Sequence, residues 1–203
     1  MAWKTPVTSL AVTCDAAYEC LLSAADTPII IEADPREVAH FVFSIGSEVG
    51  ETDTLDWQVL GGHRIIQGSA LSDSTDASNI DLAVADAQAD DYYMGMYLMM
   101  TSGGEQGELR LIGDYVNSTN LAILVTALSG TPSAGETYDI YHLSQVVDGS
   151  GSITSETTLT EALPQNAEFG ASGYPVLIPR VKAGGGTDAH LAYMTYALDG
   201  VAA

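Results

Sequence analysis

Histidines and carboxylates are the side chains of this chain that could catalyse a reaction or hold a metal ion. The histidines are isolated, with neither an i,i+4 pair nor the HExxH pattern that places two imidazoles against one zinc ion. They are His40, His63, His142 and His190. His40 and His190 alternate within expected strands and could line a groove, but isolated histidines are more often structural. We therefore predict no catalytic or metal-binding histidine.

Carboxylates are so abundant, with 27 Asp plus Glu, that some lie close together by chance. Asp53 and Asp56 could form the acid/base couple of a hydrolase, but this abundance weakens the hypothesis. The segment 73–81, DSTDASNID, could instead surround a calcium ion. Its oxygen-bearing residues are Asp73, Asp76, Asn79 and Asp81. The segment lacks the Gly and the terminal Glu of a hand-type calcium loop, so a solvated acidic connection is favoured.

The remaining motifs also indicate turns and structural residues. The glycine-rich stretches 103–107 (GGEQG) and 183–187 (AGGGT) lack the strand-to-helix context of a nucleotide-binding loop, and no GxSxG elbow is present. Cys14 and Cys20 lack the second pair that a zinc site requires, which favours unpaired thiols. The sequence 117–119, NST, fits a turn more simply than a glycosylation site. We predict no catalytic residue, no metal and no cofactor.

The charge balance restricts the possible partners. Six Lys plus Arg stand against 27 Asp plus Glu, a formal net charge of -21. The resulting field repels nucleic acids and anionic membranes, so neither is expected as a partner. The charge also fits solubility, attraction to a basic surface or a salty medium. No apolar run approaches the roughly 18 residues of a membrane span, and the first residues are too weakly apolar for a secretion signal. Synthesis and folding in a reducing cytoplasm are expected.

Alternation with a period of two residues predicts strands at both ends of the chain. Residues 40–45, HFVFSI, and 55–60, LDWQVL, alternate in this way. The Gly- and Asp-rich connection between them suits a hairpin or neighbouring strands of a sandwich. Two later strands are expected at 176–182 and 190–198. Pro175 and Pro179 flank or interrupt the first of these, which favours an edge strand or a bulge.

Short strands separated by turns predict a small β-unit in the middle. The expected strands are 96–101, 108–115, 121–128 and 137–143, spaced as in a small all-β domain. We therefore predict an all-β protein, an antiparallel β-sandwich of jelly-roll-like type with a small inserted β-domain. The expected parts are an arm or peripheral strand at 1–30, the sandwich at 31–72 plus 160–203, the inserted domain at 88–146 and a linker at 147–159.

The middle of the chain resembles a small β-module found in structural proteins of tailed-bacteriophage virions. The residues that carry this resemblance are Asp91-Tyr92-Tyr93, Gly95, the run 97–100, Thr101-Ser102-Gly103, Gly107, Arg110, Ile112, Asp114-Tyr115, Ser118-Thr119, Pro132, Gly135 and Tyr138. The match covers about a quarter of the chain. Met94 replaces a residue that is often polar in the module, and LAILVTALS at 121–129 replaces a Thr- and Trp-rich strand.

The resemblance implies a virion component without enzymatic activity. The expected function is that of a capsid decoration or cement protein on the outer surface of the phage head. Its expected partners are the major capsid protein and further copies of itself, as a homo-oligomer, with a trimer as our guess. One alternative is a tail, neck or fibre protein. Another is a carbohydrate-binding sandwich that uses Trp57, Tyr174 or Tyr193, although Trp57 shares a strand face with Leu55 and Val59, which favours a core position.

Interface residues are expected in two places. Trp3 and Lys4 belong to an N-terminal arm that could reach a neighbouring subunit. The second place is the aromatic and methionine-rich stretch that begins at residue 90, because Tyr and Met are enriched in interfaces. Its candidate residues are Tyr92, Tyr93, Met94 and Met96. The competing hypothesis for this stretch is a core role, in which strand alternation buries one side of the run.

Overall fold

The computed structural model describes residues 18–21, 28–32, 37–47, 54–74, 76–154, 165–170, 174–184 and 191–200. The strands are β1 (Glu19–Cys20), β2 (Ile31–Glu32), β3 (Glu37–Ser47), β4 (Thr54–Ala70), β5 (Asp73–Ser74), β6 (Asn79–Asp81), β7 (Tyr97–Met100), β8 (Leu109–Val116), β9 (Leu121–Leu124), β10 (Thr137–Thr154), β11 (Gln165–Gly170), β12 (Val176–Gly184) and β13 (Leu191–Gly200). A single 3-10 turn, η1 (Val84–Asp86), is the helical element of these ranges. The prediction of an all-β protein is confirmed. None of the helical structure in these ranges is long and apolar enough to cross a membrane.

The chain divides into two compact units, one formed by residues 1–62 with 144–203 and the other by residues 63–143. The inserted unit thus begins at 63 and not at the predicted residue 88. The sequence did not predict this early start, because β4 continues across the boundary as one strand of 17 residues, with Gly61 and Gly62 inside it. The predicted linker at 147–159 is also wrong in part, because β10 extends to Thr154. Pairing within a sheet overrides the Gly- and Ser-rich composition of that segment.

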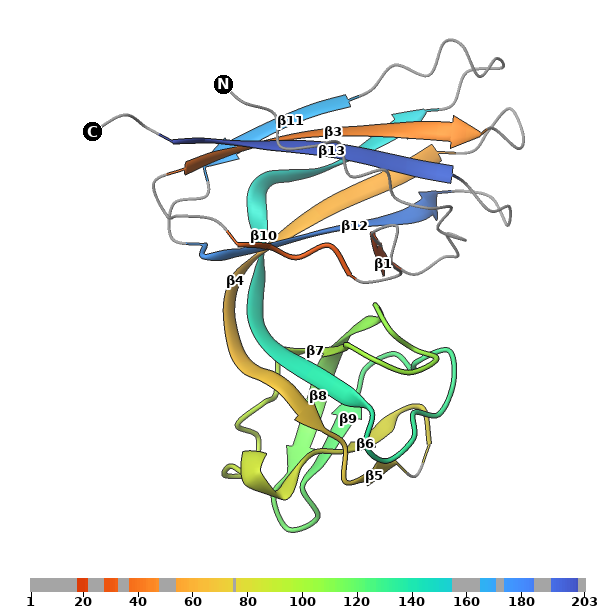
Figure 1. The fold of residues 1–203 in the computed structure, drawn as a ribbon, viewed down its shortest axis with the longest axis vertical. Helices are drawn as coiled ribbons and strands as arrows, with labels where there is room; N and C mark the ends of the chain where they lie inside the picture. Colours follow the sequence, from red (N-terminus) through yellow and green to blue (C-terminus); the bar gives the residue numbers. More distant parts are fainter. Residues whose placement is uncertain are drawn as a thin grey trace. The chain divides into compact units, whose positions relative to one another are not determined.

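The first unit contains two sheets. One has the order β11-β3-β13, and the other joins β1, β12, β4 and β10; Figure 1 shows the first sheet as a layer beside β4 and β12. The strands expected at 40–45 and 55–60 therefore lie in opposite sheets and form no hairpin. Each pairs instead with a strand from the end of the chain, with Phe41 opposite Tyr196 and Trp57 opposite Val181. Long-range antiparallel pairing builds this unit.

Pro179 lies on a strand flanked by short partners. It pairs with Val59 of β4 on one side of β12. On the other side, β2 pairs with residues 176 and 177 and β1 with residues 180 and 181. Proline cannot donate a hydrogen bond to a neighbouring strand. Pro179 lies between the residues that pair with β2 and those that pair with β1, so its missing N–H interrupts neither pairing.

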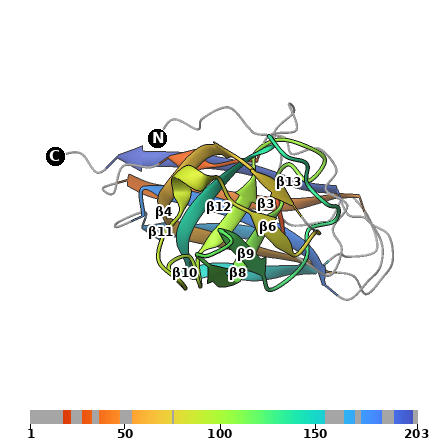
Figure 2. The same ribbon diagram turned by 90° about the horizontal axis from the view of Figure 1, so that it is seen from below.

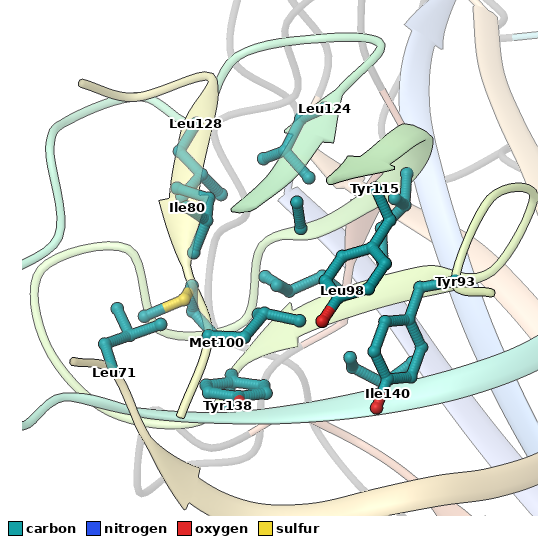
Figure 3. Close-up of a cluster of buried hydrophobic side chains, with 13 residues drawn as sticks. Leu71, Ile80, Tyr93, Leu98, Met100, Tyr115, Leu124, Leu128, Tyr138 and Ile140 are labelled. Carbon is teal, nitrogen blue, oxygen red and sulfur yellow. The ribbon is translucent and has the colours of Figure 1, made fainter. Parts of the chain in front are cut away.

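The second unit is a sheet that curls round its own core. Its strands follow the order β4-β10-β7-β8-β9-β6-β5. Since β5 begins three residues after the end of β4 in the chain, the first and last strands of this order are almost continuous, and Figures 1 and 2 show the strands curving round a shared interior. Figure 3 shows the side chains that fill it. They are Leu71, Ile80, Leu82, Tyr93, Leu98, Met100, Ile112, Tyr115, Ala122, Leu124, Leu128, Tyr138 and Ile140.

Strand β7 is buried on both faces, contrary to the expectation that alternation buries one side of this run. Leu98, Met99 and Met100 are each 0% exposed. Leu98 and Met100 point into the core of the second unit, and Met99 lies on the opposite face because successive side chains of a strand alternate. The near-continuous apolar sequence of this strand fits a strand covered on both faces better than a half-buried one.

Gly103 has a backbone conformation that only glycine adopts at low cost. Its φ is +93°, and an added Cβ would lie 2.2 Å from the Glu136 carboxylate. We expect Gly103→Ala to lower the free energy of unfolding by about 1–2 kcal/mol, mainly through the left-handed backbone. Gly104→Ala is the control, because nothing lies within 4 Å of that Cβ position. Urea denaturation measures both, and equal stabilities of the two variants would contradict the prediction.

Candidate functional site

The predicted interface residues of the second unit lie in one turn, residues 89–96, which we call the Tyr-Met turn. Its backbone is tied to β8: the N–H of Asp91 donates to the carbonyl of Tyr115 (3.0 Å), and the N–H of Gly95 donates to that of Ile112 (2.8 Å). Asp91 and Gly95 have left-handed φ values of 61° and 81°, which Asp and Gly tolerate better than most residues. The shape of the turn is therefore set before any partner binds.

The Tyr-Met turn separates the predicted interface residues into two groups. Tyr92 and Met94 are 47% and 56% exposed. Tyr93 is 1% exposed and lies in the core, so the hypothesis that it belongs to a binding surface is wrong for the free chain. Met96 is partly buried against the same core. Trp3 and Lys4, the candidates in the arm, lie outside the described residues.

Tyrosine hydroxyls hold the segment that contains η1. Tyr93 donates to the backbone carbonyl of Asp86 (2.6 Å), and Tyr138 donates to the Asp86 carboxylate (2.5 Å). The Tyr138 oxygen also accepts from the N–H of Ala83 (2.9 Å). Burial raises the pKa of Tyr93 and of Tyr138, and the Asp86 charge adds to both increases. These phenols are therefore structural donors and not acids poised for proton transfer.

Tyr115 and Asn120 extend this support. The Tyr115 hydroxyl donates to the Asn120 side-chain oxygen and accepts from the N–H of Gln88 (3.2 Å). The Asn120 amide nitrogen then donates to the carbonyls of Leu82 (2.8 Å) and Ala83 (2.6 Å). Because Asn120 has a left-handed φ of 55°, the turn that ends with it directs its side chain toward these carbonyls. The polar groups are satisfied internally, as a stable core requires.

A buried ion pair holds the loop after β9. Glu108 and Arg110 are 9% and 8% exposed, and Arg110 Nη2 donates to Glu108 Oε2 (2.6 Å). The backbone N–H of Ser129 donates to Glu108 Oε2 (3.0 Å), its hydroxyl donates to Glu108 Oε1, and Arg110 Nε donates to the carbonyl of Ala127 (3.1 Å). Glu108 directly precedes β8, and Arg110 lies two residues further on within it. A spacing of two residues in an extended chain puts both side chains on one face and could have suggested the pair.

Asp139 is the other buried carboxylate of the described residues, at 4% exposure. It accepts hydrogen bonds from the N–H of Gly68 (2.7 Å) and from the hydroxyl of Tyr141 (2.7 Å). Arg64 Nε lies 3.4 Å from its Oδ2. Burial, followed by the contacts with Asp139, raises the pKa of Tyr141. This carboxylate joins β10 to β4 and has the partners of a structural group.

Within the acidic segment, residues 76–79 form a bend that the Asp76 side chain stabilises. Asp76 accepts hydrogen bonds from the Asn79 side chain (2.7 Å) and from the N–H groups of Ser78 (2.7 Å) and Asn79 (2.9 Å). These bonds lower the pKa of Asp76, and the bond from the Asn79 side chain has the largest effect. Asp73 lies opposite Asp81 across β5 and β6. Among the described residues, no three His, Cys, Asp or Glu side chains converge to hold a metal ion.

The hydrolase hypothesis is not supported by the surroundings of Asp56. Its Oδ2 lies 3.6 Å from Lys182 Nζ, and its Oδ1 accepts from the Ser152 hydroxyl. The other member of the postulated pair, Asp53, lies outside the described residues. His63 and His142 are exposed, while the side chains of His40 and His190 lie outside the description.

A basic cluster on β12 was not expected from the sequence. Arg180 Cζ and Lys182 Nζ each lie 4.9 Å from the centre of the Tyr18 ring. Arg180 also donates from Nε (2.9 Å) and Nη2 (2.6 Å) to Gln58 Oε1. The Arg and Lys are two residues apart on one strand face, but Tyr18 and Gln58 are brought to them by pairing between distant segments. Each cation is held by an aromatic face and a polar neighbour.

Among the aromatic residues proposed for sugar binding, the side chains of Trp57 and Tyr174 are described, and each packs closely against a glycine. Trp57 is 3% exposed, and a Cβ added at Gly151 would lie 2.9 Å from its ring. Tyr174 packs as closely against Gly61, where an added Cβ would be 2.6 Å from its ring. The side chain of Tyr193 lies outside the described residues. Trp57 is therefore a core residue, as its strand face indicated, and cannot stack on a ligand.

The described polar clusters thus support the fold, and the Tyr-Met turn is the feature with the character of a binding surface. It presents two large apolar side chains on a backbone that is already ordered. No protein-family model, curated protein or solved structure matches the chain. The proposed function therefore depends on the sequence resemblance and on the geometry described above.

Proposed function

We propose that this chain is a bacteriophage head decoration or cement protein that binds the outer surface of the assembled capsid without catalysing a reaction. The observation that carries the proposal is the location of the resembling segment. Its residues, from Asp91 to Tyr138, belong to a single compact unit, 63–143, so the resemblance covers a structural module and not scattered turns. Virion localisation and the major capsid protein as partner follow from that resemblance.

Charge supports an outer position on the head. A net charge of -21 would be repelled by packaged DNA, whereas on the outside of a shell it can direct the protein to basic patches. The proposed mechanism is mass action: a protein that binds the assembled shell and not its free subunits stabilises the assembled state. The stabilisation per site is about 2.7 kcal/mol at a free concentration of 100 times Kd.

Binding to heads tests the proposal. Purified chain is mixed with empty heads formed by the shell protein encoded in the same genome, and the heads are sedimented. We expect saturable co-sedimentation, regular extra density on the outer surface by electron cryomicroscopy, and heads that resist heat better. Protein that stays in the supernatant, or density confined to the tail or neck, would contradict a decoration function. Sedimentation equilibrium of the free chain tests the proposed homotrimer.

A further inference from the structure

Two exposed apolar side chains of the second unit lie close together in the Tyr-Met turn. The large apolar residues exposed among the described residues are Ile65, Val84, Tyr92, Met94 and Val125. Tyr92 and Met94 are separated by a single residue, and that residue, Tyr93, anchors the turn in the core. The ring of Tyr92 packs edge-on against Tyr93 with centroids 4.9 Å apart, which holds the exposed ring in place.

This arrangement lowers the entropy cost of binding. The N–H of Tyr92 donates to Ala89 (3.2 Å), that of Met94 to Asp91 (3.0 Å), and that of Met96 to Tyr93 (3.0 Å). A partner would therefore contact a turn whose backbone is already ordered. Tyrosine contributes a rigid amphipathic ring, and methionine adapts to an irregular surface. Both residue types are enriched in protein interfaces.

Negative charge borders the exposed pair. Asp90 and Asp91 belong to the turn itself, and the Asp114 carboxyl of β8 lies near that of Asp91. The neighbouring Asp114 carboxyl raises the pKa of Asp91, with smaller contributions from desolvation and from the charge of Asp90. Asp90 accepts from the N–H of Asn117 (2.8 Å). A cation placed beside these carboxylates would relieve their mutual repulsion.

We propose that the Tyr-Met turn docks into an apolar depression bordered by Lys or Arg side chains on the outer surface of the capsid shell. The apolar pair supplies the buried centre of this contact, and the three carboxylates supply complementary charge at its rim. A second copy of the same turn is a poor occupant, because a symmetric contact would bring Asp90, Asp91 and Asp114 against their own copies. The inference rests on the proposed function, since it takes the shell as the partner.

Paired substitutions in the full chain test this docking element. Tyr92→Ser combined with Met94→Ser should weaken binding to empty heads about tenfold or more, the size expected for central interface residues. Val84→Ser and Val125→Ser are matched controls, because they remove exposed apolar side chains outside the turn, at 79% and 63% exposure, and should leave Kd unchanged. Met94→Ser alone provides a second variant that leaves the contact between Tyr92 and Tyr93 intact.

Charge is tested separately. The double variant Asp90→Asn with Asp91→Asn retains one side-chain oxygen at each position, and Asn suits the left-handed φ of residue 91. It should reduce the dependence of Kd on salt.

Unchanged Kd in the Tyr92 and Met94 variants, while the wild-type chain binds heads, would overturn the docking element alone. Failure of the wild-type chain to bind heads would overturn both proposals. A changed oligomeric state with unchanged head binding would assign the turn to self-association and also overturn the inference.

Discussion

Replacing Glu108 with Ala is expected to lower the free energy of unfolding of the second unit by about 3–5 kcal/mol. The substitution leaves the Arg110 guanidinium, 8% exposed, without the carboxylate 2.6 Å away. It also removes the acceptor of the Ser129 N–H and hydroxyl. A buried charge that loses its partner costs more than the pair contributed, because its desolvation is no longer compensated.

Amide hydrogen exchange is the suitable measurement, because it reports on each unit separately, whereas a single denaturation curve can merge them. Peptides from β7, β8 and β10 should lose protection in Glu108→Ala, while peptides from β12 should not. The control replaces both partners, Glu108→Leu with Arg110→Met, and should recover most of the loss, since apolar replacements of a buried pair are often neutral. A loss below about 1 kcal/mol in the single variant would show that the pair is effectively solvated.

Alkaline pH should destabilise the second unit steeply. Burial raises the folded-state pKa of Tyr93, Tyr138 and Tyr141, and an unfolded tyrosine titrates near pH 10. The stabilisation by these protonated phenols is complete below pH 10. It is lost as pH rises from 10 toward the folded-state values, because only the unfolded chain then releases the protons. The expected slope is at most about 1.4 kcal/mol per pH unit for each tyrosine, or about 4 for the three together.

Urea denaturation between pH 8 and pH 11.5 measures this slope, and phenolate absorbance follows ionisation directly. Tyr138→Phe should flatten the slope above pH 10 while lowering stability at pH 8, since the N–H of Ala83 and the Asp86 carboxylate lose their partner. Tyr92→Phe is the matched control, because that ring is 47% exposed. The prediction fails if the phenols of Tyr93, Tyr138 and Tyr141 ionise near pH 10 in a chain that stays folded.

Local patterns were sufficient where the sequence alternates along a strand. The alternation at 55–60 predicted a strand with Trp57 on its buried side, and Trp57 is 3% exposed. The turn signals between short apolar runs predicted β7, β8, β9 and the start of β10 in the second unit. The same reasoning failed for β7, whose two faces are both buried, and for Tyr93, which lies in a turn where strand periodicity does not apply. Tyr93 is anchored in the core, where its ring packs against the ring of Tyr115 with the two centroids 4.8 Å apart.

The sequence by itself determined the all-β class, the burial of the strand face with Trp57 and Val59, and a strongly acidic character, because these follow from residue periodicity and composition. Only the tertiary structure decided that the second unit begins at residue 63, that Glu108 and Arg110 are buried together with Ser129, and that Tyr92 and Met94 are exposed while Tyr93 is not. These features depend on pairing between segments far apart in the chain. Such pairing gains its free energy from joint burial and satisfied hydrogen bonds, and neither can be computed from one local stretch.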